Sequence, residues 1–186
     1  MEFSWMHDDQ AVVDDEFLIS QAKKNRSAFS PLFHRYAGRV YRYIYSRVGN
    51  VCVAEDLTSQ VFADAISALP SYRSQGQFAG WLFTLAYRRC ADYHRQPLTE
   101  SLSDEILAGE SLDPAAQALR RETSQRLERL LGELAEDELE LVRLHFAGRL
   151  TYSEMAVVLG RSEGALKMAM MRLIKKMRIR WEMSDE

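Results

Sequence analysis

Proline, cysteine and glycine are scarce in this 186-residue chain, which contains four prolines, two cysteines and nine glycines. Segments with alternating β-branched residues are nearly absent too, and together these absences favour an all-α protein. Cys52 and Cys90 stand alone, without a CxxC spacing or a neighbouring pair of histidines, so neither a disulfide framework nor a zinc site is indicated. Two isolated thiols suit a reducing compartment, where burial as small hydrophobic side chains is their simplest role.

Long apolar runs and catalytic motifs are also missing. No run approaches the roughly 20 residues that a membrane helix requires, and the N-terminus lacks the cationic start of a secretory signal. The four histidines are scattered, with no HExxH, no phosphate-binding glycine loop and no nucleophile motif. We therefore expect a cytoplasmic protein without a membrane span, without enzymatic activity, and without a cofactor or a metal.

Charge is distributed unevenly along the chain. Residues 1–16 hold six acidic side chains and residues 96–113 hold five, and neither segment contains Lys or Arg. By contrast, residues 17–95 contain eleven cations and four acids, and residues 161–180 contain seven cations and one acid. Basic segments separated by acidic ones indicate a polyanionic partner such as nucleic acid. A solvated surface is the simpler alternative.

Apolar residues at helical spacing define the domain organisation. They predict helices over residues 17–24, 28–48, 55–69, 78–95 and 115–134. The stretch over residues 96–113 is polar, acidic and rich in Ser, with Pro97 and Pro114 at its ends, which is typical of a linker. The sequence thus predicts an acidic disordered tail (1–16), a first domain (17–96), a flexible acidic linker (97–114) and a second domain (115–183).

The second domain has the pattern of a helix-turn-helix. A helix over residues 138–146 is followed by a capping box formed by Thr151 and Glu154, which opens a short apolar helix. Gly160 suits the left-handed residue that ends this helix, and Ser162 can cap a basic helix from residue 163 to about 181. Two short helices joined by a glycine turn are typical of DNA-reading modules. A plain helical hairpin is the alternative.

Five short segments match, in order and spacing, the pattern of a known family. Residues 54–62 read AEDLTSQVF, similar to AEDLTQEVF. Residues 68–73 read ALPSYR and residues 78–95 read FAGWLFTLAYRRCADYHR, which resembles ALPxFR followed by FxxWLxxIARNxxxDxxR. Residues 150–160 read LTYSEMAVVLG and residues 163–167 read EGALK, similar to LSYxEIAxxLG and xGTVK. These segments resemble regions 2 and 4 of the extracytoplasmic-function (group IV) sigma factors, which give bacterial RNA polymerase its promoter specificity.

The resemblance implies an alternative sigma factor of the bacterial cytoplasm, with core RNA polymerase and promoter DNA as partners. On the helix over 55–69, Leu57 and Val61 recur on a core face, and the resemblance assigns polymerase binding to Asp56, Gln60 and Phe62, although most of the Phe62 side chain is expected in the core. Without the resemblance, Asp56 and Gln60 are ordinary solvated residues.

By the same resemblance, the loop 71–77 and the helix after it recognise and open the −10 element of the promoter. Melting requires flipped bases to be held by polar edges and aromatic faces. Phe78, Trp81 and Leu82 recur at helical spacing and are expected in the core. The candidate residues for recognition and melting are Tyr72, Arg73, Ser74, Gln75, Arg88, Arg89 and Arg95.

The basic helix would bind the −35 element. Its candidate residues are Arg161, Ser162, Glu163, Lys167, Met168, Met171, Arg172 and Lys175. The chain departs from the family here, because Met168 follows Lys167 where the family usually continues with Ser-Arg. Methionine offers no useful hydrogen bond to a base edge, so base readout in this half is weak or rests on contact with thymine methyls. The alternative is that Met168 and Met171 are covered by another protein or by the first domain.

The acidic segments and the regulatory partner leave further alternatives open. The linker either threads into the polymerase or is a soluble tether. The resemblance implies an anti-sigma factor as a partner, and the methionines favour a second function, that of a sigma-like decoy that sequesters an anti-sigma factor without supporting initiation. Opposite charges on the linker and on the domains also predict a compact resting state.

Overall fold

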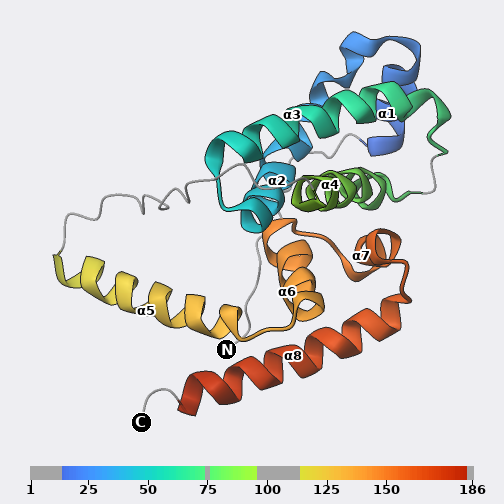
Figure 1. Cartoon of the computed structure of the whole chain (residues 1–186). Helices are drawn as coiled ribbons and strands as arrows, with labels where there is room; N and C mark the ends of the chain where they lie inside the picture. The colour runs from blue at the N-terminus through green and yellow to red at the C-terminus, as the bar shows by residue number, and fades with distance from the viewer. Residues whose placement is uncertain (1–13, 74–75, 96–113, 184–186) are drawn as a thin grey trace.

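The computed structural model describes residues 14–73, 76–95 and 114–183, and this part of the chain is helical with no strand, which confirms the all-α class (Figure 1). We define the N-terminal half as residues 14–95 and the C-terminal half as residues 114–183. The bounds of its helices are α1 (Asp15–Lys24), α2 (Ser30–Val48), α3 (Val51–Ala68), α4 (Phe78–Arg95), α5 (Pro114–Gly132), α6 (Glu136–Val142), α7 (Tyr152–Leu159) and α8 (Glu163–Met183).

The predicted acidic segments are described only at their edges. Residues 1–13 and 96–113, which hold most of the predicted tail and linker, lie outside the described residues. Asp14, assigned to the tail, is the N-cap of α1 and its side chain accepts a hydrogen bond from the Glu16 amide at 3.2 Å. Pro114, assigned to the linker, is the first residue of α5, a position where its missing amide proton has no cost.

Local capping signals set most helix ends. The Thr151 hydroxyl accepts from the Glu154 amide and the Glu154 carboxylate accepts from the Thr151 amide, so the predicted capping box is present. Gly160 has a φ of 63° in the left-handed region, as predicted. Helix α3 begins at Val51 rather than at residue 55, because the Asn50 side chain caps it by accepting from the Val53 amide at 2.9 Å.

One predicted helix is interrupted. The segment expected as a single helix over residues 138–146 consists of α6 followed by a π-helical turn, η3, over Arg143–Ala147. After it, Arg149 adopts a left-handed conformation with φ 51°, the single positive φ at a non-glycine residue in the described chain. Such a turn costs an ordinary side chain about 1–2 kcal/mol, so contacts elsewhere must hold it in place.

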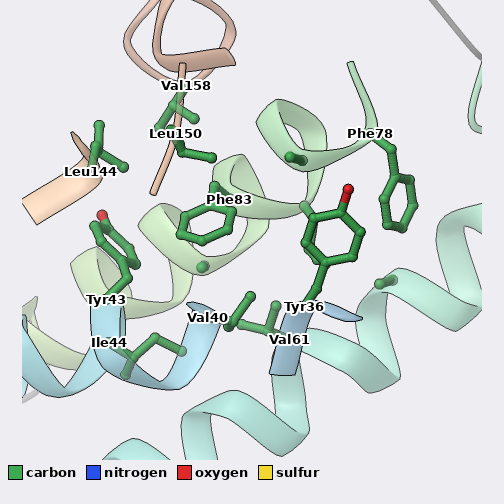
Figure 2. Packing of buried hydrophobic residues seen from close by; sticks show 14 of the residues in the cluster. Tyr36, Val40, Tyr43, Ile44, Val61, Phe78, Phe83, Leu144, Leu150 and Val158 are labelled. Atoms are coloured by element: carbon green, nitrogen blue, oxygen red, sulfur yellow. The ribbon is translucent and has the colours of Figure 1, made fainter. Parts of the chain in front are cut away.

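The buried hydrophobic residues of both halves form one continuous core. Helices α2, α3 and α4 pack around Val40, Val61 and Phe83. Leu144, Leu150 and Val158 of the C-terminal half are buried in the same cluster, facing Phe83 of α4 (Figure 2). Helix α7 lies between α4 and α8 and packs against both (Figure 1). The predicted pair of small helical domains is therefore joined by a shared core in this structure.

Two glycines permit this close packing. The three nearest neighbours of a Cβ built on Gly80 of α4 all belong to α7, with the Glu154 carbonyl oxygen and the Val157 Cβ each at 2.9 Å. A Cβ on Gly148 would lie 2.8 Å from the Phe83 ring. Real Cβ atoms do not approach this closely, so the contact between the halves depends on the absence of these two side chains.

Candidate functional site

The exposed face of α3 carries two of the residues expected to bind polymerase. Leu57 and Val61 are buried as predicted, which turns Asp56 and Gln60 to the outside of the helix. Asp56 is exposed, Gln60 is half-buried, and the Gln60 amide donates to the Asp56 carboxylate at 2.7 Å. One turn of helix thus presents a fixed pair of polar groups.

Phe62, the third candidate on α3, lies in the core. It is 3% exposed and packs edge-on against Phe29 and Phe33, with ring centroids 6.3 and 4.8 Å away. Phe33 is itself 40% exposed. The aromatic surface that this cluster offers to a partner is therefore that of Phe33, which the sequence pattern did not single out.

Tyr72, in the loop before α4, is enclosed by aromatic rings. Its ring centroid lies 4.7 Å from that of Trp81 and 5.7 Å from that of Phe78, and its carbonyl accepts a hydrogen bond from the Lys23 ammonium. Arg73 is exposed beside it. Ser74 and Gln75 lie outside the described residues. The loop thus combines a packed aromatic base with an exposed cation.

The candidate arginines of α4 differ in how they are paired. Arg89 makes a bidentate ion pair with Asp64 of α3, with nitrogen–oxygen distances of 2.6 and 2.7 Å. Arg95 pairs with Asp92 one turn away on the same helix. Arg88 is exposed, and no ion pair is recorded for it within the described residues. Arg88 is consequently the α4 arginine most accessible to an anionic ligand.

Helices α7 and α8 form the predicted helix-turn-helix. Leu166, Met170 and Leu173 of α8 are buried as one apolar stripe. The Ser162 hydroxyl accepts a hydrogen bond from the Ala165 amide at 3.3 Å and so caps α8, next to the exposed Glu163. The opposite face of α8 is open to solvent over its whole length among the described residues.

Free and paired cations occupy different parts of α8 and of the turn before it. Lys176 pairs with Glu138 at 2.7 Å, Arg178 with Glu182 at 3.0 Å, and Arg180 with Glu133 at 2.9 Å. The earlier cations are exposed and have no ion pair recorded among the described residues; they are Arg161, Lys167, Arg172 and Lys175. The first two-thirds of the helix thus presents unneutralised positive charge.

Apolar side chains are interleaved with these cations. Met168 and Met171 are 53% and 57% exposed, and Ile174 lies one turn further along with a similar exposure. Met168 and Met171 lie on the side of α8 away from the buried stripe, as expected, and Ile174 is exposed at the edge of that stripe. The exposed face of α8 is therefore mixed, basic and apolar together.

A buried polar cluster lies between the two halves, and sequence reasoning missed it. The Tyr43 hydroxyl of α2 donates to the Glu140 carboxylate of α6 at 2.6 Å, with Tyr43 fully buried and Glu140 6% exposed. Arg47 Nη1 lies 3.1 Å from Glu140 Oε2 in an ion pair, and Arg143 Nη1 lies 3.9 Å from the same oxygen. A sequence signal existed, because Glu140 lies four residues before the buried Leu144 and so on the apolar face.

The pKa values within the cluster reflect its burial. Burial raises the pKa of the Glu140 carboxyl above its ordinary value, against the opposing effects of Arg47, the Tyr43 hydrogen bond and Arg143. Burial and the Glu140 charge raise the pKa of Tyr43. Burial also raises the pKa of Cys90 to about 11, with further influence from the charges of Arg47, Glu140 and Arg143. Cys90 of α4 is thus close to the cluster.

Further contacts cross between the halves around this cluster. Arg39 donates to the Gly148 and Arg149 carbonyl oxygens, each at 2.9 Å, and Arg143 donates to the Ser46 carbonyl oxygen at 3.1 Å. The Gln77 amide donates to the Ser153 hydroxyl at 3.1 Å. A cleft of 270 Å³ lies beside Glu140 and Arg47, bounded on the C-terminal side by Arg161.

Two kinds of site are not found among the described residues. No cluster of three or more His, Cys, Asp or Glu side chains has the arrangement of a metal site there. None of the helices in that part of the chain is long and apolar enough to cross a membrane.

Family comparisons match both halves of the sequence. Residues 32–97 match the family described as Sigma-70 region 2, and residues 124–177 match the family described as Sigma-70, region 4. Together these matches cover more than half of the chain.

Individual relatives carry the same description. The chain is 33% identical over 167 residues to the ECF RNA polymerase sigma factor BldN of Streptomyces coelicolor, covering 85% of this chain and 62% of that protein. It is 28% identical over 186 residues to the ECF RNA polymerase sigma factor ShbA of Streptomyces griseus, covering 93% of this chain and 97% of that one. The chain thus spans less than two-thirds of the length of BldN but nearly all of ShbA.

A solved structure shares the fold. CnrH, determined in complex with the cytosolic domain of CnrY, superposes with a TM-score of 0.67 at 23% identity, covering 91% of this chain and 97% of that one. At this identity the likeness concerns the fold alone.

Proposed function

Because this chain belongs to the sigma-70 family, in which its relatives are extracytoplasmic-function sigma factors, we propose that it is an alternative sigma factor that binds core RNA polymerase and directs it to specific promoters. Members of this family are transcription initiation factors and not enzymes. In this proposal residues 17–96 form the region 2 domain, which recognises and opens the −10 element. Residues 115–183 form the region 4 domain, which binds the −35 element.

The observation that carries the proposal is the exposed, unneutralised charge at the start of α8. A helix-turn-helix reads the major groove with the N-terminal residues of its second helix, while cations along it contact phosphates. Arg161 and Lys167 are near that end, and Arg172 and Lys175 follow on exposed positions. The later cations are held by acidic neighbours within the C-terminal half.

Base readout by α8 is proposed to be partly apolar. Met168 and Met171 are exposed among the free cations, and thioether side chains suit contact with thymine methyl groups. The Ser162 hydroxyl caps the start of α8, and Glu163 is the first residue of that helix.

The −10 element is assigned to the loop 71–77 and to α4. Arg73 and Arg88 are exposed and have no recorded ion pair in the described chain, so they are proposed as direct DNA contacts. Arg89 and Arg95 would first have to leave Asp64 and Asp92, so phosphate binding by them competes with an existing pair. Tyr72 is proposed to support the pocket that holds the flipped bases of the −10 element. Ser74 and Gln75 are proposed to belong to the same pocket, as the resemblance implies.

Polymerase docking is assigned to the outer face of α3, where Asp56 and Gln60 form a fixed polar pair. Phe62 supports this helix from within. An anti-sigma factor is proposed as a further partner.

Reconstitution with bacterial core polymerase and transcription in vitro from a library of promoter fragments tests the proposal. Base-specific initiation is expected from the wild type. Arg172→Ala should weaken promoter binding and reduce the salt slope by about one, whereas Arg178→Ala, which removes a paired cation from the same helix, should leave both nearly unchanged. Arg73→Ala should impair opening of the −10 element.

Polymerase binding has its own matched pair of variants. Asp56→Ala should weaken binding of core polymerase, whereas Glu55→Ala, which removes a neighbouring exposed carboxylate from a different face of α3, should not. Absence of any polymerase binding by the wild type would refute the sigma-factor proposal. In that outcome, tight binding of an anti-sigma factor would establish the decoy function instead, which the exposed methionines of α8 favour.

A further inference from the structure

We propose that three arginines, at the place where α2 meets the turn between η3 and α7, form a binding site for a phosphate group. The three are Arg39 and Arg42 of α2 and Arg149 of the turn. None of them belongs to the surfaces assigned above to the promoter or to polymerase. The site is a property of the chain alone and does not depend on polymerase binding.

Arg39 is the fixed member of the site. Its Nε and Nη2 atoms donate to the Gly148 and Arg149 carbonyl oxygens, each at 2.9 Å. Its guanidinium group also lies over the Tyr36 ring, 5.1 Å from the ring centroid. These contacts hold the side chain in one orientation, and no ion pair is recorded for it among the described residues. Because a guanidinium group has five N–H donors, some remain for a ligand.

Arg42 lies beside Arg39 on the same face of α2, since residues three apart in a helix are neighbours. Its side chain folds back along the helix, so that its Nη1 would lie only 3.5 Å from a Cβ built on Gly38. Burial, followed by the positive charges of Arg149 and Arg39, lowers the pKa of Arg42. The three guanidinium groups are therefore close enough to repel one another.

Arg149 contributes its charge from a strained backbone. Its φ of 51° lies in the left-handed region, which is unfavourable for a residue with a Cβ. The turn is held by the Leu150 amide, which donates to the Leu144 carbonyl oxygen at 3.1 Å. Strained backbone is concentrated at functional sites. A glycine would adopt this conformation without strain, yet the chain has an exposed arginine here, whose charge acts on Arg42.

A phosphate group fits the chemistry of this cluster. Elsewhere in the N-terminal half, carboxylates neutralise arginines, as in the pairs of Arg35 with Asp15 and of Arg89 with Asp64. No carboxylate is recorded in this role at the three arginines within the described part of the chain. A phosphate group carries up to about two negative charges and several acceptor oxygens, and arginine binds such oxygens through parallel hydrogen bonds. An anion of this kind would remove the repulsion among the three cations.

Calorimetric titration of the full-length chain with inorganic pyrophosphate tests the site, at an ionic strength held constant with sodium chloride. The wild type should bind one pyrophosphate. Arg42→Ala should weaken binding by about tenfold, the loss expected for one hydrogen bond to a charged group. Arg178→Ala is the matched control, because it removes an exposed arginine that is already paired with Glu182, and it should bind like the wild type. Equal losses in Arg42→Ala and Arg178→Ala would show a general effect of net charge and overturn the site.

Arg149→Gly separates ligand binding from a purely structural role. Glycine accepts the left-handed backbone, so the variant should fold and should melt no lower than the wild type in the absence of ligand. Its affinity for pyrophosphate should nevertheless fall by about tenfold. Unchanged affinity in Arg149→Gly would overturn the site.

A second titration distinguishes a free phosphate from a phosphate of the DNA backbone. Fluorescence anisotropy measures binding of duplex DNA of random sequence at several salt concentrations. If the site holds a DNA phosphate, Arg42→Ala should reduce the salt slope by about one, and Arg178→Ala should not. If the site holds a free phosphate, the DNA slope of Arg42→Ala should equal that of the wild type while pyrophosphate binding is weakened. A wild type that binds no pyrophosphate, together with equal DNA slopes for the wild type and Arg42→Ala, overturns the proposal.

Discussion

Replacement of Glu140 by glutamine removes the negative charge of the buried polar cluster but keeps the shape of the side chain. The carboxylate is paired with Arg47 at 3.1 Å, and the two side chains are 7% and 11% exposed. Removal of one partner from a buried ion pair costs about 3–5 kcal/mol, because the other charge is left buried alone. The amide still accepts from the Tyr43 hydroxyl, so we expect the lower end, about 3 kcal/mol.

This magnitude translates into a melting temperature. A chain of this length loses about 2–4 °C per kcal/mol, so Glu140→Gln should lower the midpoint by roughly 6–12 °C. Glu182→Gln is the matched control, since its pair with Arg178 is exposed on the surface of the same half and an exposed pair contributes about 0.5 kcal/mol or less. Differential scanning calorimetry at neutral pH measures both.

The calorimetric outcome has a clear refutation. Equal melting temperatures for Glu140→Gln and Glu182→Gln would mean that the Glu140 carboxylate is not buried between the two halves in solution. Two separate transitions in the wild type would likewise contradict a shared core. The double substitution Arg47→Met with Glu140→Leu should recover most of the loss, because replacing both charges removes the desolvation cost as well.

A further prediction concerns the contact between the two halves. The pair Gly80→Cys and Val157→Cys, in a Cys52→Ser background, has its Cβ positions 2.9 Å apart and needs about half an ångström of relaxation to form a disulfide. Oxidation should abolish initiation at two-element promoters and reduction should restore it, and unchanged initiation by the oxidised protein would contradict a need for opening.

Local sequence signals predicted the secondary structure well where short-range chemistry decides it. The capping box of Thr151 and the left-handed Gly160 are satisfied within a few residues, so no distant partner is needed. The start of α3 at Val51 is also encoded locally, in the Asn50 cap, although the apolar pattern alone predicts a start at residue 55. The interruption at η3 has no such local signal.

The features that depend on distant partners could not be read from the sequence. Tyr43 and Glu140 are 97 residues apart, and nothing in either neighbourhood specifies the other. Gly80 looked like any small residue in a helix, because its role is set by Val157 on another element. The pairing of Arg89 with Asp64 is similar, since helical spacing identifies exposed cations but not the carboxylates that neutralise them.

The closeness of Gly80 to Val157 also bears on how freely the two halves can be exchanged. A chimera that joins the N-terminal half of this chain to the C-terminal half of a relative would keep each DNA-reading surface intact. The contact between its two halves would weaken, however, wherever the grafted half carries a larger side chain at the Val157 position or no acid at the Glu140 position. Residues at this contact are thus constrained as a pair, and modular engineering of promoter specificity has to transfer them together.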